Sequence, residues 1–91
     1  MIGIDLTGKR AIVTGAGQGL GKEIGLRLAE AGAIVYFADY DEEKSRRACQ
    51  EGIEREGHCI PWKAIDVSSV SQMRELIWEV AGQGALDIMV N

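Results

Sequence analysis

Residues 9–25 read KRAIVTGAGQGLGKEIG, and this stretch decides the fold. Its apolar run Ala11-Ile12-Val13 leads directly into glycines at alternate positions: Gly15, Gly17, Gly19 and Gly21. An amphipathic pattern follows at once, so the order predicts a strand over 10–14, a tight loop and a helix over 19–31. Such a loop offers bare backbone N–H groups and the positive end of a helix to a phosphate. The stretch therefore predicts nucleotide binding.

The remainder of the chain continues to alternate between strand and helix. Short apolar runs predict strands over 33–38, 59–65 and 86–90. Two further helices are expected, from the cap Asp41 to residue 56 and from the cap Ser68 or Ser69 to Gly82. Strands that alternate with helices of this length form parallel βαβ units with right-handed crossovers. The sequence thus predicts an α/β protein with the element order β-α-β-α-β-α-β.

Apolar residues predict which helix faces are buried. In the helix over 19–31 they recur at helical spacing, as Leu20, Ile24, Leu28 and Ala31. The second helix is mostly charged, and its few apolar members are Ala48, Cys49 and Ile53. The third helix has five, Val70, Met73, Leu76, Ile77 and Val80. We expect both tryptophans, Trp62 and Trp78, to be packing residues.

The connections predict how the strands are arranged. The expected order across the sheet is third, second, first, fourth. The first two helices should cover one face, because both crossovers move the same way, and the third helix should cover the other. One helix is too little for that face, and the strand over 86–90 is left as an apolar edge. We therefore expect homo-association through the third helix, the uncovered sheet face or this edge strand.

Composition and charge argue against several kinds of partner. The chain of 91 residues fits one domain over 1–91, and its net charge of −4 disfavours nucleic acid and anionic membranes. Its two cysteines, Cys49 and Cys59, are expected to be free thiols, and no metal-ligand spacing is evident. No segment has the apolar length of a signal peptide or a membrane helix, so we expect a cytoplasmic protein.

The glycines fit the pattern T-G-x-x-x-G-x-G, which begins at Thr14, rather than a strict G-x-G-x-x-G. In this interpretation Gly15 permits the sharp turn out of the strand. Gly19 lets the backbone approach a diphosphate, and Gly21 lets the helix lie close to the sheet. The alternative is a flexible glycine-rich turn that holds no ligand.

Asp39 is the second candidate for binding, because it follows the strand over 33–38 at the edge of the sheet where ligands bind. Its carboxylate can accept hydrogen bonds from the ribose hydroxyls of an adenosine and would repel a 2′-phosphate. This favours NAD as the cofactor, with NADP less favoured. The alternative is a solvated residue that leads the next helix, as Asp41 does.

Further residues at the same edge are weaker candidates. Asp66 is expected to end the strand over 59–65, where it either accepts from the adenine amine or closes the turn before the next helix. Tyr40 is expected to flank the adenine pocket without a catalytic role. Asn91 follows the strand over 86–90 at the same edge, or is a plain terminus. His58 lies in the turn at the remote edge, and we expect no catalytic role for it.

Together these segments resemble the short-chain dehydrogenase/reductase family over the whole chain. DLTGKRAIVTGAGQGLG resembles its first strand and glycine loop, which implies cofactor binding by Gly15, Gln18, Gly19, Leu20 and Gly21. FADYD implies that Asp39 binds the ribose, and IDVSS implies that Asp66 and Val67 lie beside the adenine. LDIMVN resembles the start of an N-N-A-G segment, of which Asn91 is present. The resemblance implies a Rossmann-like doubly wound parallel sheet, and Gln18 agrees with NAD.

The resemblance also limits what this chain can do. Members of that family transfer hydride by means of a Y-x-x-x-K motif and an upstream serine. The one match to that spacing here, Tyr40 to Lys44, directly follows the strand over 33–38 and has no serine upstream, so we do not interpret it as the catalytic motif. We therefore expect no catalytic residue here, and interpret the chain as the truncated, N-terminal dinucleotide-binding part of an oxidoreductase that is inactive alone. The alternative is a stand-alone nucleotide-binding or interaction module without catalysis.

Overall fold

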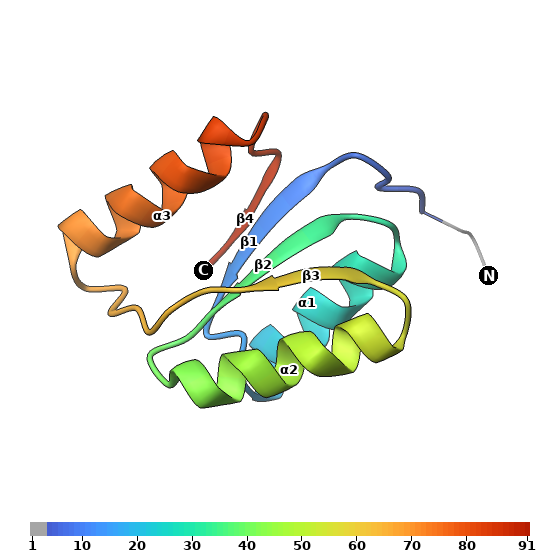
Figure 1. Cartoon of the computed structure of the whole chain (residues 1–91), viewed down its shortest axis with the longest axis horizontal. Coiled ribbons are helices and arrows are strands. Elements are labelled where there is room, and N and C mark those ends of the chain that lie inside the picture. The colour runs from blue at the N-terminus through green and yellow to red at the C-terminus, as the bar shows by residue number, and fades with distance from the viewer. Residues whose placement is uncertain (1–3) are drawn as a thin grey trace.

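The computed structural model describes residues 4–91 and consists of four strands and three helices (Figure 1). The elements are β1 Arg10–Thr14, α1 Gly19–Glu30, β2 Ile34–Ala38, α2 Glu42–Glu54, β3 His58–Pro61, α3 Val70–Gly82 and β4 Ile88–Val90. Helices α2 and α3 begin where the sequence predicts, because the side chains of Asp41 and Ser69 accept hydrogen bonds from the amides of Lys44 and Gln72.

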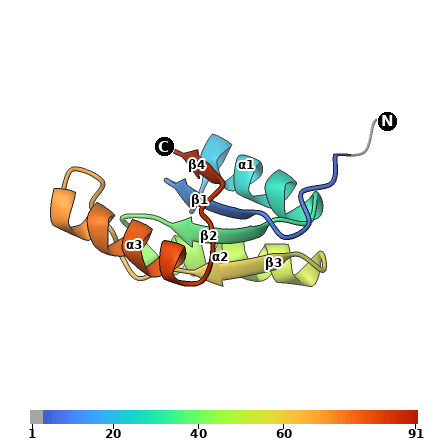
Figure 2. The same cartoon turned by 90° about the horizontal axis from the view of Figure 1, so that it is seen from above.

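The four strands form one parallel sheet in the predicted order β3-β2-β1-β4. In the register of the sheet, Thr14 lies opposite Ala38 and Val13 lies opposite Val90. Figure 2 shows the sheet with α3 in front of it and α1 and α2 behind it. The right-handed crossovers thus place the helices as predicted, and the carboxyl ends of the strands meet at one edge.

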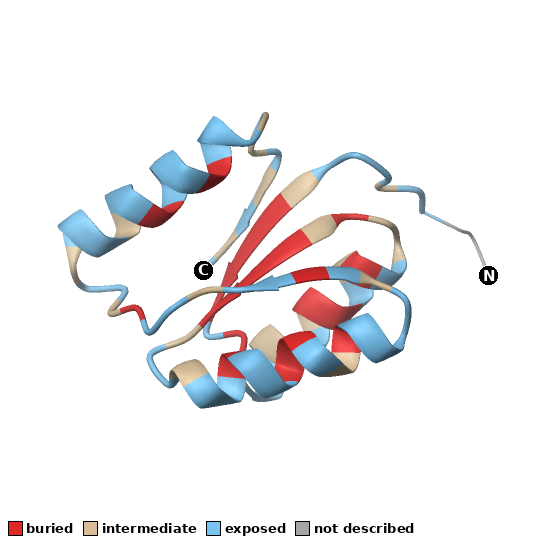
Figure 3. Cartoon of the chain, viewed as in Figure 1, coloured by how far each residue is buried: buried red, intermediate tan, exposed pale blue. Residues whose placement is uncertain are grey.

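Two apolar cores lie on opposite faces of the sheet, and the inner strands β1 and β2 are buried between them (Figure 3). Successive side chains of a strand point to opposite faces, so Val13 and Phe37 pack against α1 and α2 while Ile12 and Tyr36 pack toward α3. Leu76 and Val80 are the buried residues of α3. The core is therefore thicker on the side that carries two helices.

The buried faces of α1 and α2 agree with the prediction only in part: Ala48 and Cys49 of α2 are buried as expected, but other positions differ. Leu20 is 76% exposed, and α1 instead buries Gly25, Leu26 and Ala29 against the sheet. Gly25 is buried because the ring of Phe37 fills the space beside it, and a Cβ there would lie 2.8 Å from the ring atom Cζ. Gly52 has the same role on α2, where Ile53 is exposed. The glycines thus face the sheet beside Leu26, whereas Leu20 and Ile53 turn away from it.

The outer strands are shorter than predicted. Strand β3 ends at Pro61, which has no N–H for a sheet ladder. The chain then follows β2 through isolated hydrogen bonds from Trp62 N to Phe37 O and from Ile65 N to Asp39 O. Asp66 therefore lies in a loop rather than at the end of a strand. Trp62 packs partly against the core, as predicted, but Trp78 is 78% exposed, so its prediction as a packing residue is wrong.

The end of α2 gives a test of backbone strain. Glu56 has φ of +67°, the left-handed region that favours glycine, and its side chain is exposed. We expect Glu56→Gly to raise the free energy of unfolding by about 1 kcal/mol, measured by urea denaturation. The matched control Glu54→Gly, in the helical last turn, should lower it by about 1 kcal/mol. A loss of stability in both variants would contradict the strain at Glu56.

Candidate functional site

The loop between β1 and α1 turns the chain sharply at two glycines. Gly15 and Gly19 have φ of +65° and +59°, values that side chains disfavour. Gly21, in the first turn of α1, lies so close to the loop that a Cβ there would overlap the carbonyl oxygen of Gly15. The three glycines of the predicted motif therefore bring the start of α1 directly over the end of β1.

The N-terminus of α1 has free hydrogen-bond donors. The amides of Gly19, Leu20 and Gly21 belong to the first turn, whose N–H groups have no carbonyl partner inside the helix. Within residues 4–91, the side chain of Gln18 makes no capping bond to them, unlike the caps of α2 and α3. The first turn also has no acidic side chain. These donors and the positive end of the helix can hold an anion.

Asp39 lies beside this loop, immediately after β2, and its carboxylate is fixed by two backbone amides. One oxygen accepts from Gly17 N at 2.9 Å, and the other accepts from Asp41 N at 2.9 Å. A charged carboxylate still has lone pairs for further donors after two such bonds. The side chain therefore has a fixed orientation and can accept from a diol placed next to the loop.

Asp66 and Val67 reach the same edge from the loop before α3. One carboxylate oxygen of Asp66 accepts from Ser68 Oγ at 2.6 Å and from Ser68 N at 2.9 Å, which lowers the pKa of Asp66 below its ordinary value. The amide of Asp66 donates to Gln72 Oε1 at 2.8 Å. The carboxylate thus closes the turn before α3, the structural role that the sequence left open for it.

These residues enclose a cavity of about 340 Å³ at the carboxyl end of the sheet. It is lined by Thr14, Gly15, Asp39, Tyr40, Ile65, Asp66, Val67 and Asn91. The structure thus brings six of the predicted site residues together: Gly15, Asp39, Tyr40, Asp66, Val67 and Asn91. The other four, Gln18, Gly19, Leu20 and Gly21, lie on the adjoining loop and the first turn of α1.

Three residues outside the predicted site also belong to this region. The hydroxyl of Thr14 donates to Asn91 Oδ1 at 2.8 Å and so orients that amide, and its place in the T-G-x-x-x-G-x-G pattern could have indicated this. Gly17 orients Asp39, and a Cβ there would lie 2.9 Å from Asp39 Oδ2 and 2.7 Å from Lys44 Cβ. The ammonium of Lys44 donates to Gln18 Oε1 at 2.7 Å. No sequence pattern predicts this contact of Lys44, because only the fold brings α2 against the loop.

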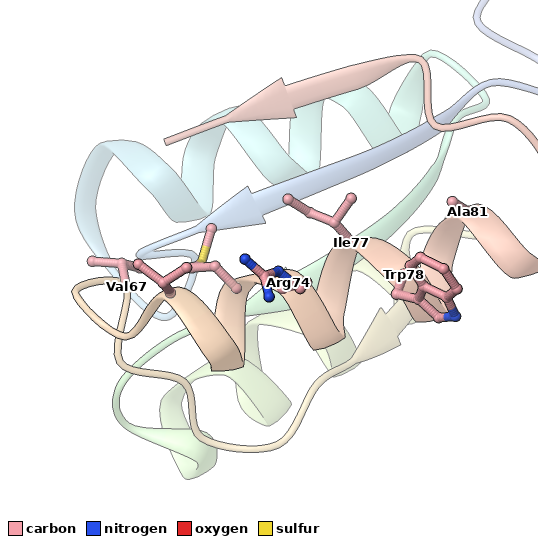
Figure 4. Close-up of a pocket in the computed structure, with 7 residues that line it drawn as sticks. Val67, Arg74, Ile77, Trp78 and Ala81 are labelled. Atoms are coloured by element: carbon pink, nitrogen blue, oxygen red, sulfur yellow. The ribbon is translucent and has the colours of Figure 1, made fainter.

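A second, apolar groove of about 480 Å³ lies along α3. Figure 4 shows Val67, Arg74, Ile77, Trp78 and Ala81 along one side of this helix. The groove has one charged lining residue, Arg74, and no part of the glycine loop, so it does not offer the donors of the first cavity. Among residues 4–91, no helix has the length and apolar character needed to cross a bilayer.

Comparison with known proteins finds relatives that all belong to one family of dehydrogenases. Residues 9–91 match the family described as short chain dehydrogenase. Human dehydrogenase/reductase SDR family member 1 is 38% identical over 94% of this chain, and Escherichia coli 7alpha-hydroxysteroid dehydrogenase is 34% identical over 94%. The chain spans 28% and 34% of the length of these two relatives.

Solved structures share the same fold. A 7 alpha-hydroxysteroid dehydrogenase complexed with NADH and 7-oxo glycochenodeoxycholic acid aligns over 98% of this chain and 35% of its own, with a TM-score of 0.90 and 33% identity. A short-chain type dehydrogenase/reductase from Mycobacterium marinum aligns over 93% of this chain and 34% of its own, with a TM-score of 0.86 and 36% identity.

Proposed function

Because this chain belongs to the short-chain dehydrogenase family, we propose that it binds the dinucleotide NAD at the loop between β1 and α1. The observation that carries this proposal is the pairing of two features. The open N-terminus of α1 offers donors for a diphosphate, and the fixed carboxylate of Asp39 beside it offers acceptors for a ribose diol. The solved relative that contains NADH supports the same kind of ligand.

Each part of the cofactor has matching residues. The amides of Gly19, Leu20 and Gly21 would donate to the diphosphate, and the turn at Gly15 leaves the backbone bare for its approach. Asp39 would accept from the adenosine ribose. Tyr40, Asp66 and Val67 line the cavity next to Asp39 and would contact the adenine, while Asn91 and Gln18 border the site.

The same carboxylate supports NAD over NADP. A 2′-phosphate placed on the ribose would face the negative charge of Asp39. The hydrogen bonds from the two backbone amides prevent that side chain from turning away. Gln18 brings no charge to the loop. The exposed ammonium of Lys44 lies against Gln18 and reduces this repulsion without removing it.

The bound nicotinamide would supply hydride transfer, the chemistry of the cofactor itself. The residues of this chain bind and orient the adenosine and diphosphate parts. The one Y-x-x-x-K match in the sequence, Tyr40 to Lys44, has no serine upstream, and the Lys44 ammonium is bonded to Gln18 at the glycine loop. We therefore propose that this chain forms the cofactor-binding part of an oxidoreductase and does not turn over substrate alone. The second candidate, an interaction module without a ligand, predicts no dinucleotide binding.

Calorimetric titration of the whole chain distinguishes the two. We expect NAD to bind at one site, and ADP-ribose to bind with a similar affinity, because the named contacts are all to that half of the cofactor. Nicotinamide mononucleotide, which lacks the adenosine and the diphosphate, should not bind measurably. Equal binding of all three compounds, or of none, would overturn the proposed function.

We also propose that two copies of this chain associate through the face that carries α3. Met89 lies opposite Ile12 in the register, and so on the α3 side of the sheet, where it is 40% exposed. Strand β4 pairs on one edge only, so its other edge can pair with β4 of a second copy. Such a pairing would bring the apolar groove of each α3 toward its partner and cover Met89.

Trp78 tests this association, because it lies in the groove and is largely exposed. We expect Trp78→Glu to weaken self-association at least about tenfold, since it exchanges a large apolar contact for a charge. Ile53→Glu, an exposed apolar residue on α2 at the other face, is the matched control and should have no effect. Light scattering after size exclusion reads the mass. A wild-type chain that stays monomeric at high micromolar concentration would refute the association.

A further inference from the structure

The two cysteines of this chain meet at the interface between α2 and β3. Cys49 lies on the sheet-facing side of α2, Cys59 lies on β3, and both belong to the core between the sheet and the first two helices. Cys49 is 1% exposed and Cys59 is 8% exposed. Both thiols are free, and each shifts the pKa of the other. The fold thus brings into one core cluster two thiols that lie ten positions apart in the sequence.

The close approach of α2 to β3 produces this contact. Gly52 lies one turn after Cys49 on the same buried side of α2, and a Cβ there would overlap Cys59 Sγ. The glycine therefore allows the helix backbone to come within contact distance of the second thiol. Strand β3 is one of the two outer strands (Figure 2) and, within residues 4–91, pairs with β2 alone, so Cys59 lies on an edge strand. Edge strands open more readily than inner strands.

The two thiols are in different environments. Interaction with Cys59 and burial raise the pKa of Cys49 well above its ordinary value. The same interaction lowers the pKa of Cys59, because it favours the Cys59 thiolate. The thiolate is the nucleophile in thiol chemistry, and Cys59 is also the more exposed thiol, so Cys59 is the group that reacts first and Cys49 is the group that follows.

We propose that Cys49 and Cys59 form a dithiol modification site, which hydrogen peroxide oxidises to an intramolecular disulfide between α2 and β3. The Cys59 thiolate attacks one peroxide oxygen, the O–O bond breaks, and Cys59 becomes a sulfenic acid as hydroxide leaves and takes up a proton to form water. Cys49, on giving up its proton, attacks the Cys59 sulfur and forms the S–S bond, and the hydroxyl group leaves with that proton as a second water. Two thiols are thereby oxidised and one peroxide is reduced.

The test oxidises the folded wild-type chain with hydrogen peroxide and measures its intact mass and its thiols. We expect a monomeric product that is lighter by the mass of two hydrogen atoms, with no thiol open to alkylation after denaturation and full recovery on reduction. Because the sequence contains two cysteines, such a monomer can contain only the Cys49–Cys59 bond. This readout does not depend on any variant folding. Product that is heavier by oxygen atoms, or disulfide found only between chains, would overturn the proposal.

Single variants test the order of the two steps. Cys49→Ala leaves the nucleophile without its partner, so oxidation should stop at a sulfenic acid that dimedone traps on Cys59. Cys59→Ala leaves the more deeply buried thiol, which is 1% exposed against 8% for Cys59 on the edge strand, and we expect Cys49 to react at least about tenfold more slowly than the thiol of the first variant. Faster oxidation of Cys49 than of Cys59 would contradict the assigned roles.

Discussion

Replacing Gly21 by alanine is expected to abolish dinucleotide binding and to destabilise the fold. The added Cβ would overlap the carbonyl oxygen of Gly15, a backbone atom that cannot rotate away as a side chain can. Overpacking of this kind costs about 3 kcal/mol or more, and any relief of it moves α1 away from the loop. Because that movement takes the loop amides away from the diphosphate, NAD should bind at least about a hundredfold more weakly. Calorimetric titration with NAD and urea denaturation measure the two effects.

Gly82→Ala is the matched control for this substitution. Gly82 is also a helical glycine, but a Cβ there would meet no atom within 4 Å. Alanine should therefore leave NAD binding unchanged and should raise the free energy of unfolding by about 0.5–1 kcal/mol. If Gly21→Ala kept both the stability and the affinity of the wild-type chain, the close approach of α1 to the loop would not be what positions the binding amides.

Replacing Asp39 by asparagine is expected to reverse the preference for NAD over NADP. Asparagine keeps an acceptor for the Gly17 amide but loses the charge-assisted bonds to the ribose, so NAD should bind about tenfold more weakly. NADP should bind more tightly, because the repulsion of its 2′-phosphate is removed while the ammonium of Lys44 remains at the loop. Together these effects should change the ratio of the two dissociation constants about a hundredfold.

The neighbouring carboxylate provides the control for this substitution. Asp41 caps α2 by accepting from Lys44 N, and asparagine caps helices about as well as aspartate. Asp41→Asn removes one negative charge near the loop without touching the acceptor assigned to the ribose, so the ratio of the two dissociation constants should stay within about twofold. Equal changes in both variants would mean that net charge, rather than the fixed carboxylate of Asp39, determines the preference.

The topology and the glycine loop were predictable because each depends on a repeated or local pattern. Alternating strands and helices leave few arrangements for parallel strands with right-handed crossovers, and the observed order β3-β2-β1-β4 is one of these. The turn at Gly15 and Gly19 was predictable because glycine readily adopts the positive φ that both positions have. The position of Asp39 beside the loop followed from the rule that carboxyl ends of parallel strands share one edge.

The buried helix faces were predictable only in part, because packing depends on shape as well as on apolar character. Counting apolar side chains selects Leu20 and Ile53, whereas the structure buries Gly25 and Gly52, whose partners supply the bulk. A glycine opposite Phe37 is a complementary pair that cannot be recognised before the register of helix and strand is known. For the same reason no sequence pattern indicated the contact of Lys44 with Gln18.

The most direct test of the central claim is an amide nitrogen–proton correlation spectrum of the chain, recorded as NAD is added. If the loop between β1 and α1 binds the diphosphate, the amide signals of Gly17, Gly19, Leu20 and Gly21 should shift together and saturate with one dissociation constant. Amides along α3, including Gly82, should stay in place. Unshifted loop amides at saturating NAD, or shifts confined to the groove on α3, would contradict the claim.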